Sequence, residues 1–167
     1  MSKTATLAFS IWTSFLAAVF NYFHGLTPFE CNWVMFVCLA IFFGMNMTPR
    51  ELPSALLSAW VGMAWGQFDF LLTSLLGMTG ISLALAMFLA VLLGTTITMF
   101  IHIYMLSNTP LRHMPFVFAG VCLTFSQGGG NVIGLGATIA MGLALAGLCG
   151  AGQMFAIKKW PADEKAN

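Results

Sequence analysis

The sequence predicts an all-α integral membrane protein with six transmembrane helices, arranged as two inverted repeats of three helices each. Three observations support this prediction. Hydrophobic residues make up 59% of the chain and charged residues only 7%, whereas soluble domains carry about 25% charged residues. Apolar segments alternate with short breaks that are rich in Gly, Pro and polar residues. In a six-helix topology, every Lys and Arg falls on the same side of the membrane.

The composition also excludes several classes of protein. So few polar residues could not cover the core of a water-soluble enzyme. A net charge of +1 gives no basic surface for a nucleic acid, and the high hydrophobicity excludes a disordered chain. The sequence has no HExxH motif, no nucleophile–base pair and no acidic pair. We therefore expect no enzyme activity, no cofactor and no metal site.

Apolar runs of about 20 residues are needed to cross the hydrocarbon, and the breaks divide the first half of the chain into three apolar segments. The first segment covers about 5–26 and ends before Thr27-Pro28. The second runs over 31–43, and the break 44–51 separates it from the third, at about 53–76. Lys3 precedes the first segment as in a signal peptide, but no small-x-small cleavage site follows, so we expect this segment to be retained.

The second half of the chain shows the same order of segments. The fourth segment covers about 81–106, and a polar loop over 107–113 leads to the fifth, which begins at Met114. The polar and Gly-rich run 126–131 interrupts the chain before the sixth segment, 132–157. We expect one transmembrane bundle over 1–160, with a polar cytoplasmic tail at 161–167.

Basic residues predict the orientation, because Lys and Arg favour the cytoplasmic side. With the N-terminus in the cytoplasm, the inner side carries Lys3, Arg50, Arg112, Lys158, Lys159 and Lys165. This arrangement needs an even number of spans, and both termini then lie in the cytoplasm.

Matching features in the two halves predict repeats at about 5–76 and 80–157. Thr-Pro follows the first and fourth segments, Val-Cys-Leu lies in the second and fifth, and Gly-Gln lies in the third and sixth. Because each repeat has three spans, the second repeat enters the membrane from the opposite side. Coincidence between apolar segments of similar composition is the alternative explanation.

The second and fifth segments are too short to cross a bilayer. Residues 31–43 and 114–126 would each extend only about 20 Å as helices, against about 30 Å of hydrocarbon. Short or interrupted segments at corresponding positions of two repeats indicate a transport site. Polar interfacial loops closing two tilted helices are the alternative. The expected solute pathway comprises Phe43, Gly44, Asn46, Thr48, Thr124, Phe125, Ser126, Gln127, Gly128, Gly129, Gly130 and Asn131.

These breaks would offer neutral hydrogen-bonding groups to a solute. The three consecutive glycines expose backbone N–H and C=O groups, and Asn131 is positioned to cap the sixth helix. Thr48-Pro49-Arg50-Glu51 has the sequence of a capping box. Phe43 and Phe125 are candidate apolar gates. Such a constriction suits a small polar solute, neutral or anionic.

Ionisable residues within membrane segments are secondary candidates for function. Asp69 lies late in the third segment, His24 near the end of the first and His102 near the end of the fourth. Their positions near segment ends also fit simple solvation. No acidic partner lies within one helical turn of any of them, which disfavours a proton relay.

The sequence resembles a family of small bacterial inner-membrane proteins catalogued as domain of unknown function 1097. The resemblance is carried by the stretch 33–44 and its Gly/Asn break, the stretch 120–128, and the Gly-spaced sixth segment, and it covers about 9–160. It implies a polytopic inner-membrane protein of this size. It implies no activity and assigns no functional residue.

From these observations we expect a channel or facilitator for a small polar solute, with passive flow through a homo-oligomer in the lipid bilayer. The alternative is a non-transporting assembly or regulatory subunit, in which the two breaks would be packed shut.

Overall fold

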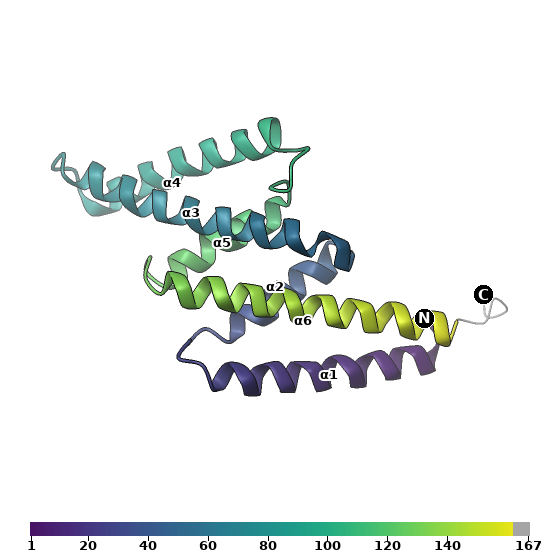
Figure 1. The fold of residues 1–167 in the computed structure, drawn as a ribbon. Helices are drawn as coiled ribbons and strands as arrows, with labels where there is room; N and C mark the ends of the chain where they lie inside the picture. Colours follow the sequence, from purple (N-terminus) through teal and green to yellow (C-terminus); the bar gives the residue numbers. More distant parts are fainter. Residues whose placement is uncertain (162–167) are drawn as a thin grey trace. The chain divides into compact units, whose positions relative to one another are not determined.

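The computed structural model describes residues 1–161, and regular structure in this range is entirely helical (Figure 1). The predicted tail therefore lies, beyond Pro161, outside the described residues. The long helices are α1 (Lys3–Gly25), α3 (Leu52–Gly77), α4 (Leu83–Phe100) and α6 (Val132–Lys159). The short helices are α2 (Trp33–Gly44) and α5 (Met114–Ser126). A 3₁₀ turn, Pro49–Glu51, precedes α3, and a π-helical turn, Ile101–Met105, extends α4.

Helix lengths agree with the segments expected from the sequence. Within residues 1–161, four helices are long and apolar enough to cross a membrane, namely α1, α3, α4 and α6 with their flanking turns. The other two, α2 and α5, have 12 and 13 residues. The all-helical class and the shortness of the second and fifth segments are thus confirmed.

The contacts between residues in space divide the molecule into two compact units. Unit 1 comprises residues 1–52 together with the chain from Thr138 onward, and so contains α1, α2 and most of α6. Unit 2 comprises Pro53–Ala137, which contains α4, α5, nearly all of α3 and the first turns of α6. Each unit therefore combines two long helices with one short helix.

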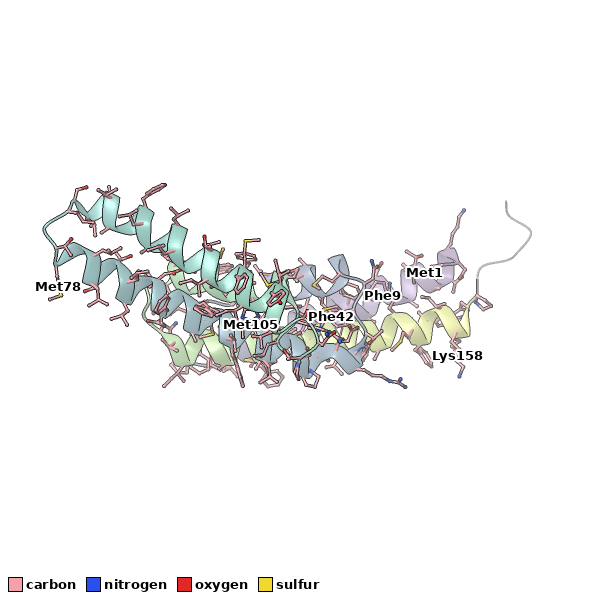
Figure 2. The ribbon with its side chains drawn as sticks, turned by 90° about the horizontal axis from the view of Figure 1, so that it is seen from above. Met1, Phe9, Phe42, Met78, Met105 and Lys158 are labelled. Atoms are coloured by element: carbon pink, nitrogen blue, oxygen red, sulfur yellow. The ribbon has the colours of Figure 1, made fainter. Side chains whose placement is uncertain are left out.

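In unit 1, α1 lies antiparallel beside α6, and the N-terminus meets the far end of α6 (Figure 1). The Ser2 hydroxyl donates a hydrogen bond to the Trp160 carbonyl at 2.7 Å, and the Trp12 indole donates to the Leu148 carbonyl at 3.0 Å. Met1 and Lys158 accordingly lie at the same end of the unit (Figure 2). The short helix α2 crosses α6 closely, because a Cβ at Gly142 would meet the Met35 Cα at 2.7 Å.

In unit 2, α3 and α4 form a helical hairpin with Met78 at its tip (Figure 2). The short helix α5 crosses α3 where both helices carry glycine. A Cβ at Gly62 would collide with the Val117 backbone, and one at Gly120 would lie 2.7 Å from the Met63 nitrogen. The GxxxG spacing of Gly62 and Gly66 thus serves close helix packing.

The long helices also carry many large apolar side chains on their exposed faces. On α4, for example, Phe88, Leu92 and Phe100 are all more than half exposed, whereas the small residues Ala90 and Gly94 are buried. An apolar outer surface with a small-residue inner surface is typical of helices surrounded by lipid.

The same capping arrangement follows α1 and the π turn after α4. The Thr27 hydroxyl donates to the His24 carbonyl at 2.7 Å and accepts from the Phe29 nitrogen at 3.3 Å. The Thr109 hydroxyl donates to the Leu106 carbonyl at 2.8 Å and accepts from the Leu111 nitrogen at 3.2 Å. The two Thr-Pro sequences that suggested a repeat therefore form the same local structure.

Candidate functional site

The first break, in unit 1, begins with a left-handed residue at the end of α2. Asn46 has φ 52°, a conformation that costs energy for any residue with a Cβ. Its N–H donates to the Phe43 carbonyl at 3.0 Å, and the Met47 N–H donates to the Phe42 carbonyl at 3.1 Å. This pattern turns the chain sharply at the end of a helix that is about 18 Å long.

The second break, in unit 2, starts with the same hydrogen-bond pattern at the end of α5. Gly128 has φ 58° and its N–H donates to the Phe125 carbonyl at 3.0 Å, while the Gly129 N–H donates to the Thr124 carbonyl at 3.0 Å. In backbone geometry, Gly128 therefore corresponds to Asn46. Asn131, the asparagine of the second break, lies three residues further along.

Asn131 marks the other end of the second break. Its φ is 49°, so it and Asn46 are the two non-glycine residues with a left-handed backbone in the described part of the chain. Its side-chain oxygen lies against Gly134, where an added Cβ would collide with it. The amide thus lies over the first turn of α6, as expected from its predicted capping position.

Residues of α3 hold the second break in place. The Gln67 Nε2 donates to the Gly129 carbonyl at 2.7 Å. The Phe70 ring lies 4.8 Å from the Phe125 ring between centroids, and a Cβ at Gly129 would meet Phe70 at 3.0 Å. In the sequence, Gln67 stands out only as part of the Gly-Gln match between the two halves. Its contact with Gly129 could not be predicted there, because the two residues are 62 positions apart in the chain.

The capping box predicted after the first break is formed. The Glu51 carboxylate accepts hydrogen bonds from the Thr48 N–H at 2.9 Å and from the Thr48 hydroxyl at 3.1 Å. Phe43 packs edge-on against Phe9 of α1, with the ring centroids 5.8 Å apart. Each candidate gate, Phe43 or Phe125, is thus held by an aromatic neighbour of its own unit.

The candidate residues of the two breaks fall into three groups by exposure. Seven of them are exposed, namely Gly44, Asn46, Thr48, Ser126, Gly128, Gly130 and Asn131. Four are partly buried, namely Phe43, Phe125, Gln127 and Gly129. Thr124 is buried, and its hydroxyl donates to the Gly120 carbonyl at 2.8 Å. The Ser126 hydroxyl donates to the Leu123 carbonyl in the same way, at 2.7 Å.

A groove of about 480 Å³ opens beside the second break in unit 2. Gln67 provides its polar side chain, and the rest of the lining is Trp60, Met63, Ala64, Val132 and Gly136. The Trp60 indole donates to the Gly136 carbonyl at 3.2 Å, which fixes that wall of the groove. The groove thus combines the Gln67 amide with mostly apolar walls.

Valine at position 46 should destabilise the fold, because a β-branched residue is strained in the left-handed region. We expect Asn46→Val to lower the free energy of unfolding by about 1–3 kcal/mol. Asn46→Gly, which keeps the turn without strain, should stay within about 0.5 kcal/mol of the native protein. Titration with SDS in mixed micelles, followed by far-UV circular dichroism, measures both. Equal stability of the Val and Gly variants would contradict this reading of the turn.

The candidate His24 is buried in unit 1 rather than solvated. Only 1% of its surface is exposed, and a hydrogen bond of 3.0 Å joins its Nε2 to the Thr138 hydroxyl of α6. The Cys31 thiol donates to the same hydroxyl at 3.7 Å. Thr138, which is 114 positions from His24 in the chain, therefore connects the imidazole of His24 to the thiol of Cys31.

His102 is buried in unit 2, and both of its ring nitrogens are satisfied. It lies in the π turn, where its Nδ1 donates to the Leu111 carbonyl at 2.8 Å. Because Nδ1 carries the proton, Nε2 accepts the hydrogen bond from the Trp65 indole, at 3.1 Å. These contacts hold a neutral imidazole in one tautomer and one orientation.

The loop after the π turn contains polar contacts that the sequence did not indicate. The hydroxyls of Ser54 and Ser58 donate to the Pro110 carbonyl, and the Ser58 hydroxyl accepts from the His113 nitrogen at 3.3 Å. His113 is buried, although it belongs to a stretch predicted as a plain polar loop. No signal in the linear sequence indicates that this loop folds onto the start of α3.

Asp69 lies buried on α3, facing α4, with 3% of its surface exposed. Its Oδ1 occupies the position that a Cβ would take at Gly94. No group of three or more His, Cys, Asp or Glu side chains that could hold a metal ion occurs among residues 1–161.

Four long apolar helices, with large apolar side chains on their exposed faces, indicate the class of this protein, a multi-pass helical membrane protein. Residues 6–153 match the family described as Protein of unknown function (DUF1097), so the chain belongs to that family. The resemblance seen in the sequence is thereby confirmed. No curated protein and no solved structure matches the chain.

Proposed function

We propose that this protein is a channel or facilitator for a small polar solute, neutral or anionic, that flows passively, and that each unit contributes its own break, 44–51 or 126–131, to the passage of the solute. The observation that carries the proposal is the pair of short helices, α2 and α5, which end in the same left-handed turn. Backbone polar groups at membrane depth are tolerated where they line a water-filled cavity or are covered by protein. The exposed amides of Asn46 and Asn131 favour the first of these arrangements.

The groove beside the second break supports a solute of modest size. Its lining is apolar apart from Gln67, whose amide is anchored on the Gly129 carbonyl. Solute sites in proteins are mostly apolar, with a few polar groups that fix orientation. The neutral donors and acceptors of this break are the groups that would replace water around a small amide, polyol or short carboxylate.

We further propose that the chain is an inverted duplication, with repeats at 5–76 and 80–157. The shared Thr-Pro caps and the shared turns after α2 and α5 support it, because both recur at an offset of 82 residues, from Thr27 to Thr109 and from Asn46 to Gly128. The helices that make up each unit also fit an inverted duplication. Unit 1 joins α1 and α2 to most of α6, and unit 2 joins α4 and α5 to nearly all of α3, so each unit takes its third helix from the other repeat.

An inner-membrane location with both termini in the cytoplasm is part of the same proposal. In unit 1, Lys3 lies at the end of the unit that carries Lys158 and Lys159, as the contact between Ser2 and Trp160 requires. Arg50 lines a groove with Met154 of α6, towards that end as well. Basic residues gathered at one end agree with the positive-inside rule. Assembly into a homo-oligomer in the bilayer would enclose a wider path than one small protomer.

Solute-driven swelling of proteoliposomes tests the proposed function. Stopped-flow light scattering would compare small amides, polyols and short carboxylates in turn. The informative variants are Asn46→Gly and Asn131→Gly, because glycine removes the amide and retains the left-handed backbone. We expect swelling faster than in protein-free vesicles for one solute class. Each variant should reduce this rate about fivefold, equivalent to one lost hydrogen bond of about 1 kcal/mol.

Asn21→Ala is the matched control, because Asn21 is an exposed asparagine of α1 whose amide accepts a hydrogen bond only from the exposed Asn32 in the structure described. It should swell at the native rate. If no solute accelerates swelling, or if all three variants reduce the rate equally, the pathway at the breaks is ruled out.

A further inference from the structure

A single acidic side chain lies within the described long helices, and the solute pathway proposed above does not use it. Asp69 is eight residues before the last residue of α3, Gly77, which places it about 12 Å from that end of the helix. Its exposed fraction is 3%. The other acidic residues among 1–161, Glu30 and Glu51, lie outside the long helices.

The carboxyl group of Asp69 fits into a space made by a glycine. Its Oδ1 lies against the backbone of α4, and a Cβ at Gly94 would coincide with this oxygen. The buried stripe of α4 around it consists of small residues, including Ala90 one turn before and Thr98 one turn after. The packing of α3 on α4 therefore encloses the carboxyl group.

This enclosed oxygen has no hydrogen-bond partner in the described structure. The nearest hydroxyl on its own helix, that of Thr73, donates to the backbone carbonyl of Asp69 at 2.8 Å and not to its carboxyl group. Buried polar atoms without a partner are rare and call for a specific explanation.

No positive charge on the helices of unit 2 compensates Asp69. Neither α3, α4 nor α5 contains Lys or Arg. The other titratable groups on these elements and their connecting turns are Cys122, His102, Tyr104, Arg112 and His113. His102 is eight residues, or about 12 Å, beyond Gly94 along α4, and both its nitrogens are engaged.

The two remaining nitrogen-bearing groups lie towards the opposite end of α3. Arg112 is exposed, and His113 contacts Ser58, eleven residues or about 16 Å before Asp69 along the helix. An ionised carboxylate in this apolar enclosure would be strongly unfavourable without a counter-ion. A single bound proton removes that cost. A metal cation would need several more oxygen ligands, which the enclosure does not supply.

We propose that Asp69 is an intramembrane proton-binding site, with Gly94 providing the space in which the neutral carboxyl group sits. The ligand is one exchangeable proton, and Gly94 acts as a positioning residue. This inference rests on the packing of unit 2 alone and is independent of the solute pathway.

An apolar carbodiimide, dicyclohexylcarbodiimide, tests the proposal on the purified full chain. The O–H of a protonated carboxyl group adds across one C=N bond of this reagent, and the adduct rearranges to a stable N-acylurea without a leaving group. We expect the mass adduct to map to Asp69 and to be absent from the exposed Glu30. Labelling should fall as the pH rises, following the loss of one proton. Asp69→Asn, which keeps the size of the side chain, should abolish it.

Two glycine variants test whether labelling of Asp69 depends on the space at Gly94 or on burial alone. Gly94→Ala should displace the carboxyl group and reduce the labelling severalfold, whereas Gly77→Ala, which has no atom within 4 Å of the added Cβ, should label as the native chain does. The pH titration of the native protein needs no variant to fold. Absence of the adduct from Asp69 at every pH would overturn the proposal. So would protection by Na⁺ at constant pH, which would assign the site to a cation.

Discussion

Leucine at position 120 should separate α3 from α5 and prevent unit 2 from folding. A Cβ there would lie 2.7 Å from the Met63 nitrogen and 2.9 Å from the Gly62 carbonyl carbon, and it would collide with the Ala59 carbonyl oxygen. All three are backbone atoms of α3, so they cannot move aside as a flexible side chain would. Overpacking of a core costs about 1–3 kcal/mol where side chains adjust. We therefore expect Gly120→Leu to lose at least about 3 kcal/mol in an SDS titration.

Gly77→Leu is the control for this prediction within the same unit, since its Cβ would meet no atom within 4 Å. It should unfold at nearly the native SDS fraction. Gly142→Leu should resemble Gly120→Leu, because in unit 1 its Cβ would lie 2.7 Å from the Met35 Cα and 3.0 Å from the Met35 carbonyl oxygen. A Gly120→Leu protein with native stability would show that the two helices do not cross so closely.

Replacing His102 with leucine should also cause a large loss of stability. The variant removes two hydrogen bonds and leaves the Trp65 indole N–H and the Leu111 carbonyl without their partner. A polar group left buried without its hydrogen-bond partner costs about 1–3 kcal/mol, and measured values for hydrogen bonds inside membrane proteins lie at the lower end. We expect a total loss of about 2–4 kcal/mol in the free energy of unfolding.

Trp65→Phe removes only one of these two hydrogen bonds, so it should cost about half as much as His102→Leu. Tyr104→Phe serves as the matched control in the same π turn, because Tyr104 is exposed and its ring stacks on Phe100 without needing the hydroxyl. The Tyr104→Phe variant should be as stable as the native protein. If His102→Leu and Tyr104→Phe are equally stable, the imidazole contributes nothing to the packing of α3 on α4.

The sequence predicted the helices well because their ends are marked locally. Proline and glycine breaks separate the apolar runs, and the ends of α3, α5 and α6 lie within about two residues of the expected segments. The capping box at Thr48 and Glu51 was also predicted, since it depends on residues three apart. The π turn after α4 was not, because an apolar run looks the same in an α-helix and in a π-helix.

The environment of the candidate site residues could not be predicted in the same way. Position near a segment end suggested that His24 and His102 are solvated, whereas their partners, Thr138 and Trp65, lie 114 and 37 positions away. Gln67 is tied to Gly129 across 62 positions. Such contacts arise from how helices pack, and one sequence carries no record of which helices become neighbours.

The composition of unit 1 has a consequence for biosynthesis. The unit joins residues 1–52 to the chain from Thr138 onward, so its first two helices are made long before α6, the helix on which both pack. While Pro53–Ala137 is being translated, α1 and α2 remain without their main partner. Unit 2 needs only the first turns of α6 and therefore has nearly all of its helices available earlier. Domains generally assemble as their residues emerge, so unit 2 should be the first to pack, and unit 1 should close only when the last helix is inserted.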